Sequence, residues 1–401
     1  MSQTVQIIRA RRQDQPRFST LPPLSLYIHL PWCVRRCPYC DFNAHVAPEI
    51  LPEKAFLQAL ELDLERALPS IWGRTVQTIF FGGGTPSLMS ADFIHKALSL
   101  VRALLPLTPG AEVTLEANPG ASEAQRFHDY GQAGVTRLSI GVQSFNDQVL
   151  QAIGRIHDAT QARQAIDAAI QAVEQVNLDL MYALPQQGIE DCLQGVQEAI
   201  DTGVNHLSIY HLMLEPNTVF AKYPPPLPSE EDSYLMHDRI IELVEAAGFE
   251  HYEVSAFAKQ GFYGQHNLNY WTFGDYLGIG PGAHSKLSFP DKIVREVRLS
   301  NPYSWMAAAS DRQKNPLAEQ YTVPVPELPF EFMLNALRLK KGVPIEYFTG
   351  HTGLNQHMIA KPWRQAIEKG LMVDRLDRLQ ATELGWRFLT DLQSLFLNEN
   401  N

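Results

Sequence analysis

Short apolar runs alternate with amphipathic helical segments through the first half of the chain. About six runs rich in Val, Ile, Leu and Phe predict buried strands at 25–30, 77–81, 112–117, 137–142, 176–182 and 206–212. Helical segments separate them; residues 51–68, for example, place Phe56, Leu60 and Leu64 on one face. Repeated strand–helix units predict an α/β fold with a parallel sheet inside and helices outside, curled into a full or partial six-unit barrel.

Functional residues of such barrels lie where the strands end at their carboxyl side. Chemically informative residues stand at these positions here. They are Cys33, the turn at Gly82, Glu116, Gln143, Asp179 and Met213. The sequence therefore predicts one site at this edge of the sheet.

Proline-rich breaks divide the 401 residues into regions. We expect a disordered arm at 1–22, the barrel at 23–222, and a sheet extension at 223–320 that opens with YPPPLP. Residues 321–401 predict a small domain of helices and a short hairpin, similar to a winged helix. The first residues carry arginines without a following apolar run, which argues against a secretory signal, and no apolar run is long enough to span a bilayer.

Charge and cysteine usage narrow the function classes. The formal net charge of −11 argues against nucleic acid as a partner, because phosphate binding needs a cationic face. Three of the four cysteines lie within eight residues, which is not a disulfide framework but a metal-binding cluster in a reducing compartment, so we expect a cytoplasmic protein. The fourth, Cys192, lies alone in a predicted helix and is interpreted as a small buried hydrophobe.

The cysteine triplet follows directly after the first predicted strand. Cys33, Cys37 and Cys40 have the spacing C-x3-C-x2-C, and thiolates are soft ligands that suit iron–sulfur clusters and zinc. Three thiolates can hold three corners of a [4Fe–4S] cluster and leave the fourth iron open. The alternative is a zinc site completed by His29 or His45, although structural zinc sites favour paired cysteines.

With this loop, a set of further motifs resembles the radical S-adenosylmethionine (SAM) proteins over nearly the whole chain. More closely, the chain resembles the oxygen-independent coproporphyrinogen oxidase family, and within that family its haem-chaperone branch. The matching segments are YIHLPWCVRRCPYCDF, FFGGGTPS, LEANPG, RLSIGVQSF, GRIH, NLDLMYALP, HNLNYW and GIGPGAHS.

The resemblance implies a SAM site next to the cluster. Gly83, Gly84 and Thr85 would hold the amino acid part of SAM, which chelates the open iron. Tyr39 would shield the cluster and meet the adenine. Glu116 ends the third predicted strand, where a carboxylate can accept both ribose hydroxyls.

Five further residues match positions around SAM in this family. Tyr27, Gln143 and Asp179 would lie near the ligand, and Met213 would meet it through its backbone. The guanidinium fork of Arg155 suits the SAM carboxylate, although Arg155 and Asp179 could instead form a structural pair. Whether one or two SAM molecules bind is left open.

Bound together, the cluster and SAM define a reaction class. A reduced cluster passes one electron to the SAM sulfonium, and cleavage of a carbon–sulfur bond gives methionine and a 5′-deoxyadenosyl radical that abstracts hydrogen. The cofactors carry this chemistry, while the protein orients them and excludes water.

Two departures argue against coproporphyrinogen oxidation. Phe42 stands where the oxidases continue with a further cysteine. Only 24 residues precede the first predicted strand, whereas the oxidases carry substrate-binding elements there. We therefore expect no coproporphyrinogen oxidase activity.

The HNLNYW segment favours haem binding. His266 is a candidate axial ligand, and Tyr270 and Trp271 could form a flat wall beside the ring. His284 is a second candidate for the axial ligand. The alternative for each of the two histidines is a purely structural role. His29 is expected to orient the cysteine loop instead.

Two functions follow from the resemblance. The first is a haem chaperone that binds haem, cluster and SAM and passes haem to respiratory cytochromes through transient contacts with membrane-bound proteins. The alternative is a radical SAM oxidase or methyltransferase acting on a porphyrin.

Overall fold

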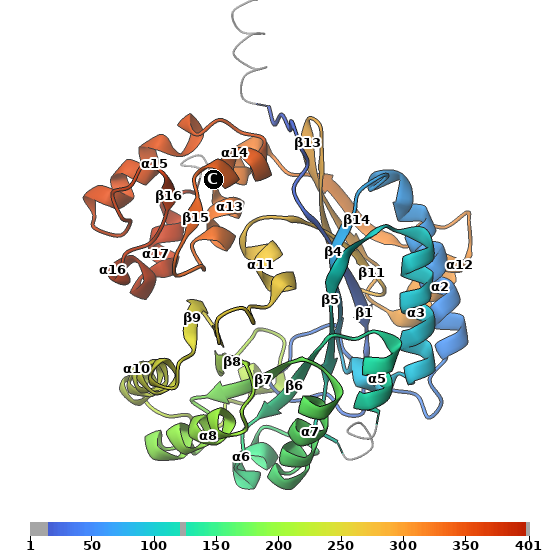
Figure 1. Cartoon of the computed structure of the whole chain (residues 1–401), viewed down its shortest axis with the longest axis vertical. Helices are drawn as coiled ribbons and strands as arrows, with labels where there is room; N and C mark the ends of the chain where they lie inside the picture. Colours follow the sequence, from blue (N-terminus) through green and yellow to red (C-terminus); the bar gives the residue numbers. More distant parts are fainter. Residues whose placement is uncertain (1–14, 121–125, 398–401) are drawn as a thin grey trace, which may run out of the picture.

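A single curved sheet organises the chain (Figure 1). The computed structural model describes residues 15–120 and 126–397. Within these residues, the main sheet has twelve strands in the order β14-β13-β12-β11-β1-β4-β5-β6-β7-β8-β10-β9. The sheet does not close on itself, so the barrel is partial.

The six predicted strands form the centre of this sheet and run parallel, which confirms the α/β prediction. They are β1 (Leu24–Leu30), β4 (Val76–Gly83), β5 (Leu107–Ala117), β6 (Arg137–Gln143), β7 (Gln175–Tyr182) and β8 (His206–His211).

The connecting helices cover the convex face of the sheet (Figure 1). They are α2 (Glu53–Ala67), α3 (Ala91–Leu104), α5 (Phe127–Ala133), α6 (Asp147–Ala152), α7 (Ala159–Ala172), α8 (Ile189–Asp201) and α10 (Glu230–Ala246). The main apolar core lies between sheet and helices, where side chains such as Leu26, Ile79 and Phe93 are fully buried. Burial of apolar surface stabilises the folded chain by about 25 cal/mol per Å². The packing of this layer therefore keeps the ends of the strands in fixed positions.

A seventh parallel strand was not predicted. β11 (Asp275–Ile279) pairs with the free edge of β1, with Leu26 opposite Leu277. Its sequence DYLGI is too short and mixed to stand out as an apolar run, and only its long-range partner makes it a strand.

Antiparallel strands extend the sheet beyond both parallel edges. On one side lie β12 (His284–Phe289), β13 (Lys292–Arg298) and β14 (Leu317–Thr322), and on the other the hairpin of β9 (Glu250–Glu253) and β10 (Ala256–Ala258). β14 runs across the predicted boundary at 320/321, and its pairing with β13 places residues 320–322 in the sheet.

Helix α11 (Gln265–Trp271) carries the HNLNYW segment and lies on the concave side of the sheet (Figure 1). Its first turn is held by a strand residue from inside the barrel. Glu112 Oε1 accepts a hydrogen bond from His266 N at 3.0 Å, and Glu112 Oε2 accepts one from Gln265 N at 3.2 Å. A carboxylate at a helix amino terminus satisfies donors that have no partner within the helix.

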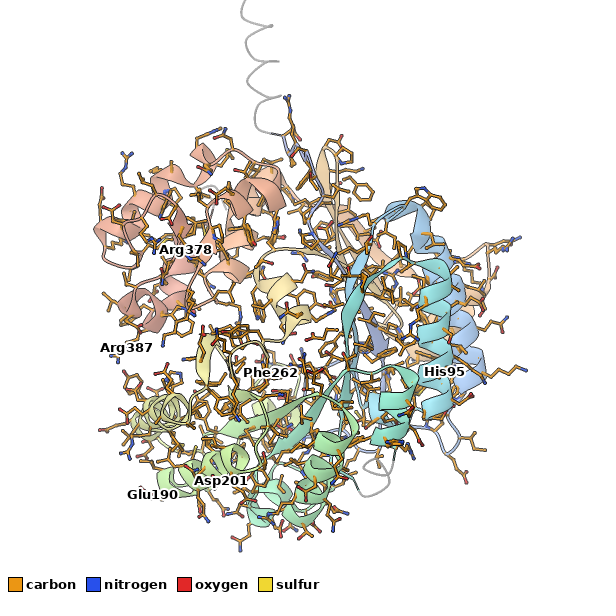
Figure 2. The ribbon with its side chains drawn as sticks, in the orientation of Figure 1. His95, Glu190, Asp201, Phe262, Arg378 and Arg387 are labelled. Atoms are coloured by element: carbon orange, nitrogen blue, oxygen red, sulfur yellow. The ribbon has the colours of Figure 1, made fainter. Side chains whose placement is uncertain are left out.

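The C-terminal region forms a second core on the concave side (Figures 1 and 2). Its elements are α13 (Leu328–Ala336), β15 (Val343–Pro344), α14 (Glu346–Thr352), α15 (His357–Glu368), β16 (Arg378–Leu379), α16 (Glu383–Arg387) and α17 (Leu389–Ser394). β15 and β16 pair antiparallel across α14 and α15. The short hairpin is instead local, with Met372 opposite Ala381 and Val373 N donating to Gln380 O at 3.0 Å. In Figure 2, Arg378 and Arg387 lie in this domain, whereas His95 lies on the outer layer of helices.

The segment before β1 differs in part from the expected disordered arm. Phe18 packs against the second core, and Arg17 N donates to Gly353 O at 2.8 Å. Residues 15–22 are therefore placed by contacts with the C-terminal domain, while residues 1–14 lie outside the described part of the chain.

A buried ion pair joins the helical layer to the sheet extension. Asp63 on α2 accepts hydrogen bonds from Arg298 Nε at 2.8 Å and from Trp305 Nε1 at 3.1 Å. Arg298 ends β13, and Trp305 lies on α12 (Pro302–Ser310). Both charged side chains are only 2% exposed, so neither could be solvated if its partner were removed.

We expect Asp63→Ala to lower the free energy of unfolding by about 3–5 kcal/mol, because it removes the close carboxylate partner of the buried Arg298 and leaves only Glu296, 3.7 Å away. Urea unfolding followed by tryptophan fluorescence measures this. The matched control is Asp92→Ala, which removes an exposed i,i+4 pair with Lys96 and should cost less than about 0.5 kcal/mol. Equal costs for the two variants would contradict the structural role of Asp63.

Candidate functional site

The cysteine loop is anchored at both ends beside the first parallel strand. β1 leads through Pro31 into β2 (Trp32–Cys33), which pairs in parallel with β3 (His45–Val46). The backbone bonds are His45 N to Pro31 O at 2.7 Å and Ala47 N to Cys33 O at 2.8 Å. The segment between β2 and β3 therefore forms a closed loop that carries Cys37 and Cys40.

Side-chain hydrogen bonds brace this loop from two directions. Asn43 Nδ2 donates to Pro281 O and to Ser300 O, each at 2.9 Å, which ties the loop to the sheet extension. On the opposite side, His29 Nε2 donates to Asn43 O at 2.9 Å. His29 Nδ1 is then the acceptor for the Tyr27 hydroxyl at 3.0 Å. Burial lowers the pKa of His29 to about 4, so the ring is neutral and keeps this arrangement.

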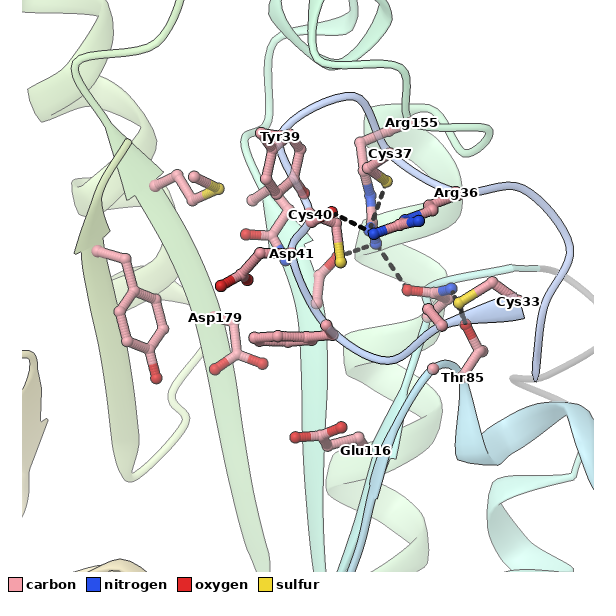
Figure 3. A pocket seen from close by; sticks show the side chains of 18 of the residues that line it. Cys33, Arg36, Cys37, Tyr39, Cys40, Asp41, Thr85, Glu116, Arg155 and Asp179 are labelled. Atoms are coloured by element: carbon pink, nitrogen blue, oxygen red, sulfur yellow. Dashed lines mark hydrogen bonds between the residues drawn. The ribbon is translucent and has the colours of Figure 1, made fainter. Parts of the chain in front are cut away.

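The three cysteines line one cavity of about 380 Å³ at the carboxyl ends of the parallel strands (Figure 3). The cavity also takes in most of the predicted SAM residues. These are Tyr39, Gly83, Gly84, Thr85, Glu116, Gln143, Arg155, Asp179 and Met213. Tyr27 does not line this cavity but the one beside it. The parallel topology thus brings together residues from the ends of six strands and, with Arg155, from the segment after α6.

The engagement of the nearby histidines favours a cluster over a single zinc ion. In the described residues, no three His, Cys, Asp or Glu side chains converge on one point as a mononuclear site requires. In a [4Fe–4S] cluster, each thiolate binds a different iron, so the sulfurs stand apart. The histidines that could complete a zinc site are otherwise engaged: His29 and His45 both bond Asn43, the latter to Oδ1 at 3.1 Å. The donor set therefore fits a cluster.

The glycine turn after β4 packs closely on the cysteine loop. Gly83 has φ of 117°, and a Cβ there would lie 2.5 Å from the His29 ring. A Cβ on Gly84 would lie 2.7 Å from Trp32 O. Side chains at these positions would push the loop away, and their absence leaves backbone groups open to a ligand.

Two carboxyl groups, those of Glu116 on β5 and Asp179 on β7, face the cavity from strands that are separated by β6 (Figure 3). Burial, together with the nearby Asp179 charge, raises the pKa of Glu116 to about 8. Burial also raises the pKa of Asp179 to about 6, against hydrogen bonds from Ser139 Oγ at 3.0 Å and Asn177 Nδ2 at 2.9 Å. Glu116 Oε2 accepts from Gly83 N at 3.1 Å, which links the carboxyl group to the glycine turn.

Arg155 does not pair with Asp179 in this structure. Its Nη2 donates to Asn118 Oδ1 at 2.7 Å and to Gly141 O at 2.6 Å, and its Nη1 donates to Cys37 Sγ at 3.7 Å. Its Nε is buried and has no hydrogen-bond partner within the described residues. A buried N–H donor without a partner at the cavity wall is suited to donate to an anionic ligand group such as a carboxylate. Asn118 is a site residue that sequence reasoning missed, although it stands in the LEANPG motif two positions after Glu116.

A second cavity of about 650 Å³ adjoins the first. The two share four lining residues, namely Asp41, Phe42, Gly83 and Glu116. Aromatic side chains of Tyr270, Trp271 and Tyr276 line the second cavity, and the exposed His284 lies at its edge. The predicted aromatic wall is thus next to the cysteine site.

His266 lies outside both cavities. Its side chain is buried against β4, where Nδ1 bonds Thr78 Oγ1 at 2.8 Å and Nε2 bonds the Tyr270 hydroxyl at 2.9 Å. Burial lowers its pKa to about 3, so the ring is neutral. Both ring nitrogens are occupied, and His266 could reach a metal only after these bonds break. The sequence could not show this, because Thr78 is 188 residues away.

Comparisons with known proteins agree with this geometry. The radical SAM superfamily model matches residues 27–199, and the HemN C-terminal domain model matches residues 323–388. Heme chaperone HemW of Escherichia coli (strain K12) is 46% identical over 381 residues, covering 94% of this chain and 99% of that protein. The chain belongs to the HemW family of radical SAM proteins. The HemW of Haemophilus influenzae is 44% identical over 385 residues, again covering 94% of this chain and 99% of the relative.

A solved structure shows the same fold at lower identity. The coproporphyrinogen III oxidase HemN of Escherichia coli, a radical SAM enzyme, superposes with a TM-score of 0.79 at 21% identity, covering 97% of this chain and 93% of that one. This HemW-family chain therefore shares its overall fold with the oxidase HemN at low sequence identity. In the described part of the chain, no helix is both long and apolar enough to cross a bilayer.

The raised pKa of Glu116 predicts a pH-dependent stability of the ligand-free protein. The folded state keeps a proton that the unfolded chain releases at about pH 4.5, so stability falls as pH rises from there to about pH 8, by at most about 1.4 kcal/mol per pH unit. Glu116→Gln should make this decline shallower, most visibly between pH 6 and 8, where Asp179 has largely titrated. Urea unfolding at several pH values tests this; parallel curves for both proteins would contradict it.

Proposed function

We propose that this chain is a haem chaperone that holds a [4Fe–4S] cluster, SAM and haem in two adjoining cavities. The observation that carries the proposal is the wall shared by the cysteine cavity and the aromatic cavity, which includes Phe42 and Glu116. Both volumes fall in the range of about 300–1,000 Å³ that is typical of small-molecule sites. The full-length similarity to proteins named heme chaperone supports it.

Cys33, Cys37 and Cys40 would each hold one iron and leave the fourth iron open for SAM. Burial raises the pKa of the Cys33 thiol and raises that of Cys40 to about 11, so metal binding must displace protons from these groups. When bound, such a cluster supplies the electron that cleaves SAM. The chain itself supplies three soft ligands on a braced loop and shields them with Tyr39.

The SAM site would be built from backbone and charged groups around the open iron. The turn at Gly83 and Gly84 would receive the amino acid part, and the unpartnered Nε of Arg155 would donate to its carboxylate. Glu116 would accept from the ribose hydroxyls. Gln143 and Asp179 would line the remaining wall, and Met213 would lie at the edge of the cavity.

Haem would lie in the aromatic cavity. Tyr270, Trp271 and Tyr276 offer flat apolar surface to a porphyrin ring, and Arg295 is a cation in the same wall. We propose His284 as the axial ligand, because it lines this cavity, whereas His266 is engaged on both nitrogens. His266 would instead support the site by holding Tyr270.

The proposed role includes transfer of haem to membrane-bound haem proteins such as respiratory cytochromes, through transient contacts. We place the protein in the cytoplasm, since its four cysteines are unpaired and an exposed cluster loop needs a reducing compartment.

A second candidate function is radical SAM oxidation or methylation of a porphyrin. The fold shared with coproporphyrinogen III oxidase favours it. Against it stands Phe42, which is 61% exposed and lines both cavities. The family resemblance implies a cysteine at this position in the oxidases. Incubating the reconstituted protein with SAM, a reductant and coproporphyrinogen decides this: conversion would support the enzyme, and none is expected.

Cysteine substitutions test the cluster. Cys33→Ser, Cys37→Ser and Cys40→Ser should each abolish a [4Fe–4S] cluster after anaerobic reconstitution, because each removes the ligand of one iron. Cys192→Ser is the matched control; its thiol is buried on α8 in the main core and should leave the iron and sulfide content unchanged. Loss of cluster in the control would show that the ligand set is assigned incorrectly.

Histidine substitutions test the haem site. His284→Ala should weaken haem binding and move the Soret band, because removing an imidazole changes the ligand field of the iron. His266→Ala should leave the Soret position in place. His95→Ala, on the outer face of α3 (Figure 2), is the control and should bind haem as the unaltered protein does. A shifted spectrum in His266→Ala with a normal one in His284→Ala would assign the ligand to α11 instead.

A further inference from the structure

We propose that Asn118 is a positioning residue that links two cluster-ligating cysteines, and that the link raises the reduction potential of the cluster. The inference rests on the proposed cluster site. It concerns a side chain that touches none of the three sulfurs and has no role in the preceding proposal.

One half of the link runs to Cys33. Asn118 Nδ2 donates to Thr85 Oγ1 at 2.9 Å, and Thr85 Oγ1 donates to Cys33 Sγ at 3.4 Å. Thr85 is 3% exposed, so water does not compete for its hydroxyl. In Figure 3, Thr85 lies directly beside Cys33.

The other half runs to Cys37. Arg155 Nη2 donates to Asn118 Oδ1 at 2.7 Å, and Arg155 Nη1 donates to Cys37 Sγ at 3.7 Å. The same Nη2 donates to Gly141 O at 2.6 Å, which holds the guanidinium against β6. The two cysteines are thus joined by the continuous path Cys33–Thr85–Asn118–Arg155–Cys37.

Donor and acceptor chemistry allows one orientation of this path. Arginine has only donors, so it must face the carbonyl oxygen of the Asn118 amide. The amide nitrogen then faces Thr85, which must accept with its oxygen and use its single hydrogen elsewhere. The remaining acceptor is the Cys33 sulfur. An aspartate at this position could not donate to Thr85, and a leucine could neither donate nor accept. Asparagine does both, and it thereby directs the Thr85 hydroxyl and the Arg155 guanidinium toward sulfur.

The backbone holds Asn118 in place independently of its side chain. Asn118 N donates to Ser87 Oγ at 3.3 Å, and Asn118 O accepts from Gly120 N at 2.9 Å. Substitution of the side chain should therefore change the hydrogen bonds to sulfur while the strand end stays where it is.

Hydrogen bonds to ligand sulfurs change the potential of an iron–sulfur cluster. A reduced cluster carries one more negative charge than the oxidised cluster, so donors aimed at its sulfurs stabilise the reduced form more. Loosening Thr85 and Arg155 together should lower the potential. Asn118 would not bind the cluster itself. It would orient the donors to the ligand sulfurs, as the hydrogen-bond partners of metal-bound histidines orient those histidines.

The test is a redox titration of the anaerobically reconstituted full chain, followed by electron paramagnetic resonance. Asn118→Leu, of similar size, should give a lower midpoint potential than the unaltered protein at the same iron and sulfide content. Thr85→Val should also lower it, and Thr85→Ser, which keeps the hydroxyl, should not. The double variant Asn118→Leu/Thr85→Val should shift by less than the sum of the single shifts, because both act on one bond to Cys33.

Thr114→Val is the matched control, since it removes a hydroxyl from the same strand β5 with no link to a cysteine, and it should leave the potential unchanged. If Asn118→Leu does not accumulate, Asn118→Ala gives the same comparison. A fully loaded Asn118 variant with the potential of the unaltered protein overturns the inference alone. An unaltered protein that takes up no cluster overturns the proposed function, and the two failures are told apart by iron analysis before titration.

Discussion

The position of the cysteine loop depends on the hydrogen bonds of Asn43. The loop has little regular sheet pairing of its own, and its backbone must find partners elsewhere. Asn43 holds the loop in place, because its Nδ2 donates to Pro281 O and Ser300 O while its own carbonyl accepts from His29 Nε2. The turn that receives it needs glycine, because a Cβ on Gly282 would lie 2.3 Å from Asn43 Nδ2. The sheet extension therefore helps to position the cysteine loop, although it carries no cysteine.

The charged groups that line the cavity suit a ligand that itself carries a positive and a negative group. Within the part of the chain that the structure describes, Glu116 and Asp179 have no cationic side chain in direct contact, and burial raises the pKa of both. Arg155, the buried cation nearby, is turned toward Asn118 and Cys37 instead. A positively charged group entering this space would favour the ionised carboxylates. A sulfonium compound such as SAM has this property, and its carboxylate would meet the unpartnered Arg155 Nε.

The second cavity receives its shape from α11, and here His266 has a supporting role. Its ring lies 5.0 Å from that of Phe80 and bonds Thr78, which fixes the helix to β4. The helix then presents Tyr270 and Trp271 one turn later, on the side of the cavity. The HNLNYW segment thus supplies both the anchor of α11, through His266, and part of the aromatic wall, through Tyr270 and Trp271.

The sequence by itself determined the parallel α/β core and most of the residues that the strand ends bring together around the cysteine triplet. These features are local: apolar periodicity defines each strand, and parallel strands bring the residues after Cys33, Gly83 and Glu116 to one edge. The tertiary structure decided β11, the bracing of the loop by Asn43, the burial of His266 and the place of Asn118 between two cysteines. Each of these depends on contacts between distant segments, up to 257 residues apart for Asn43 and Ser300, and no local pattern encodes which polar group will find which partner.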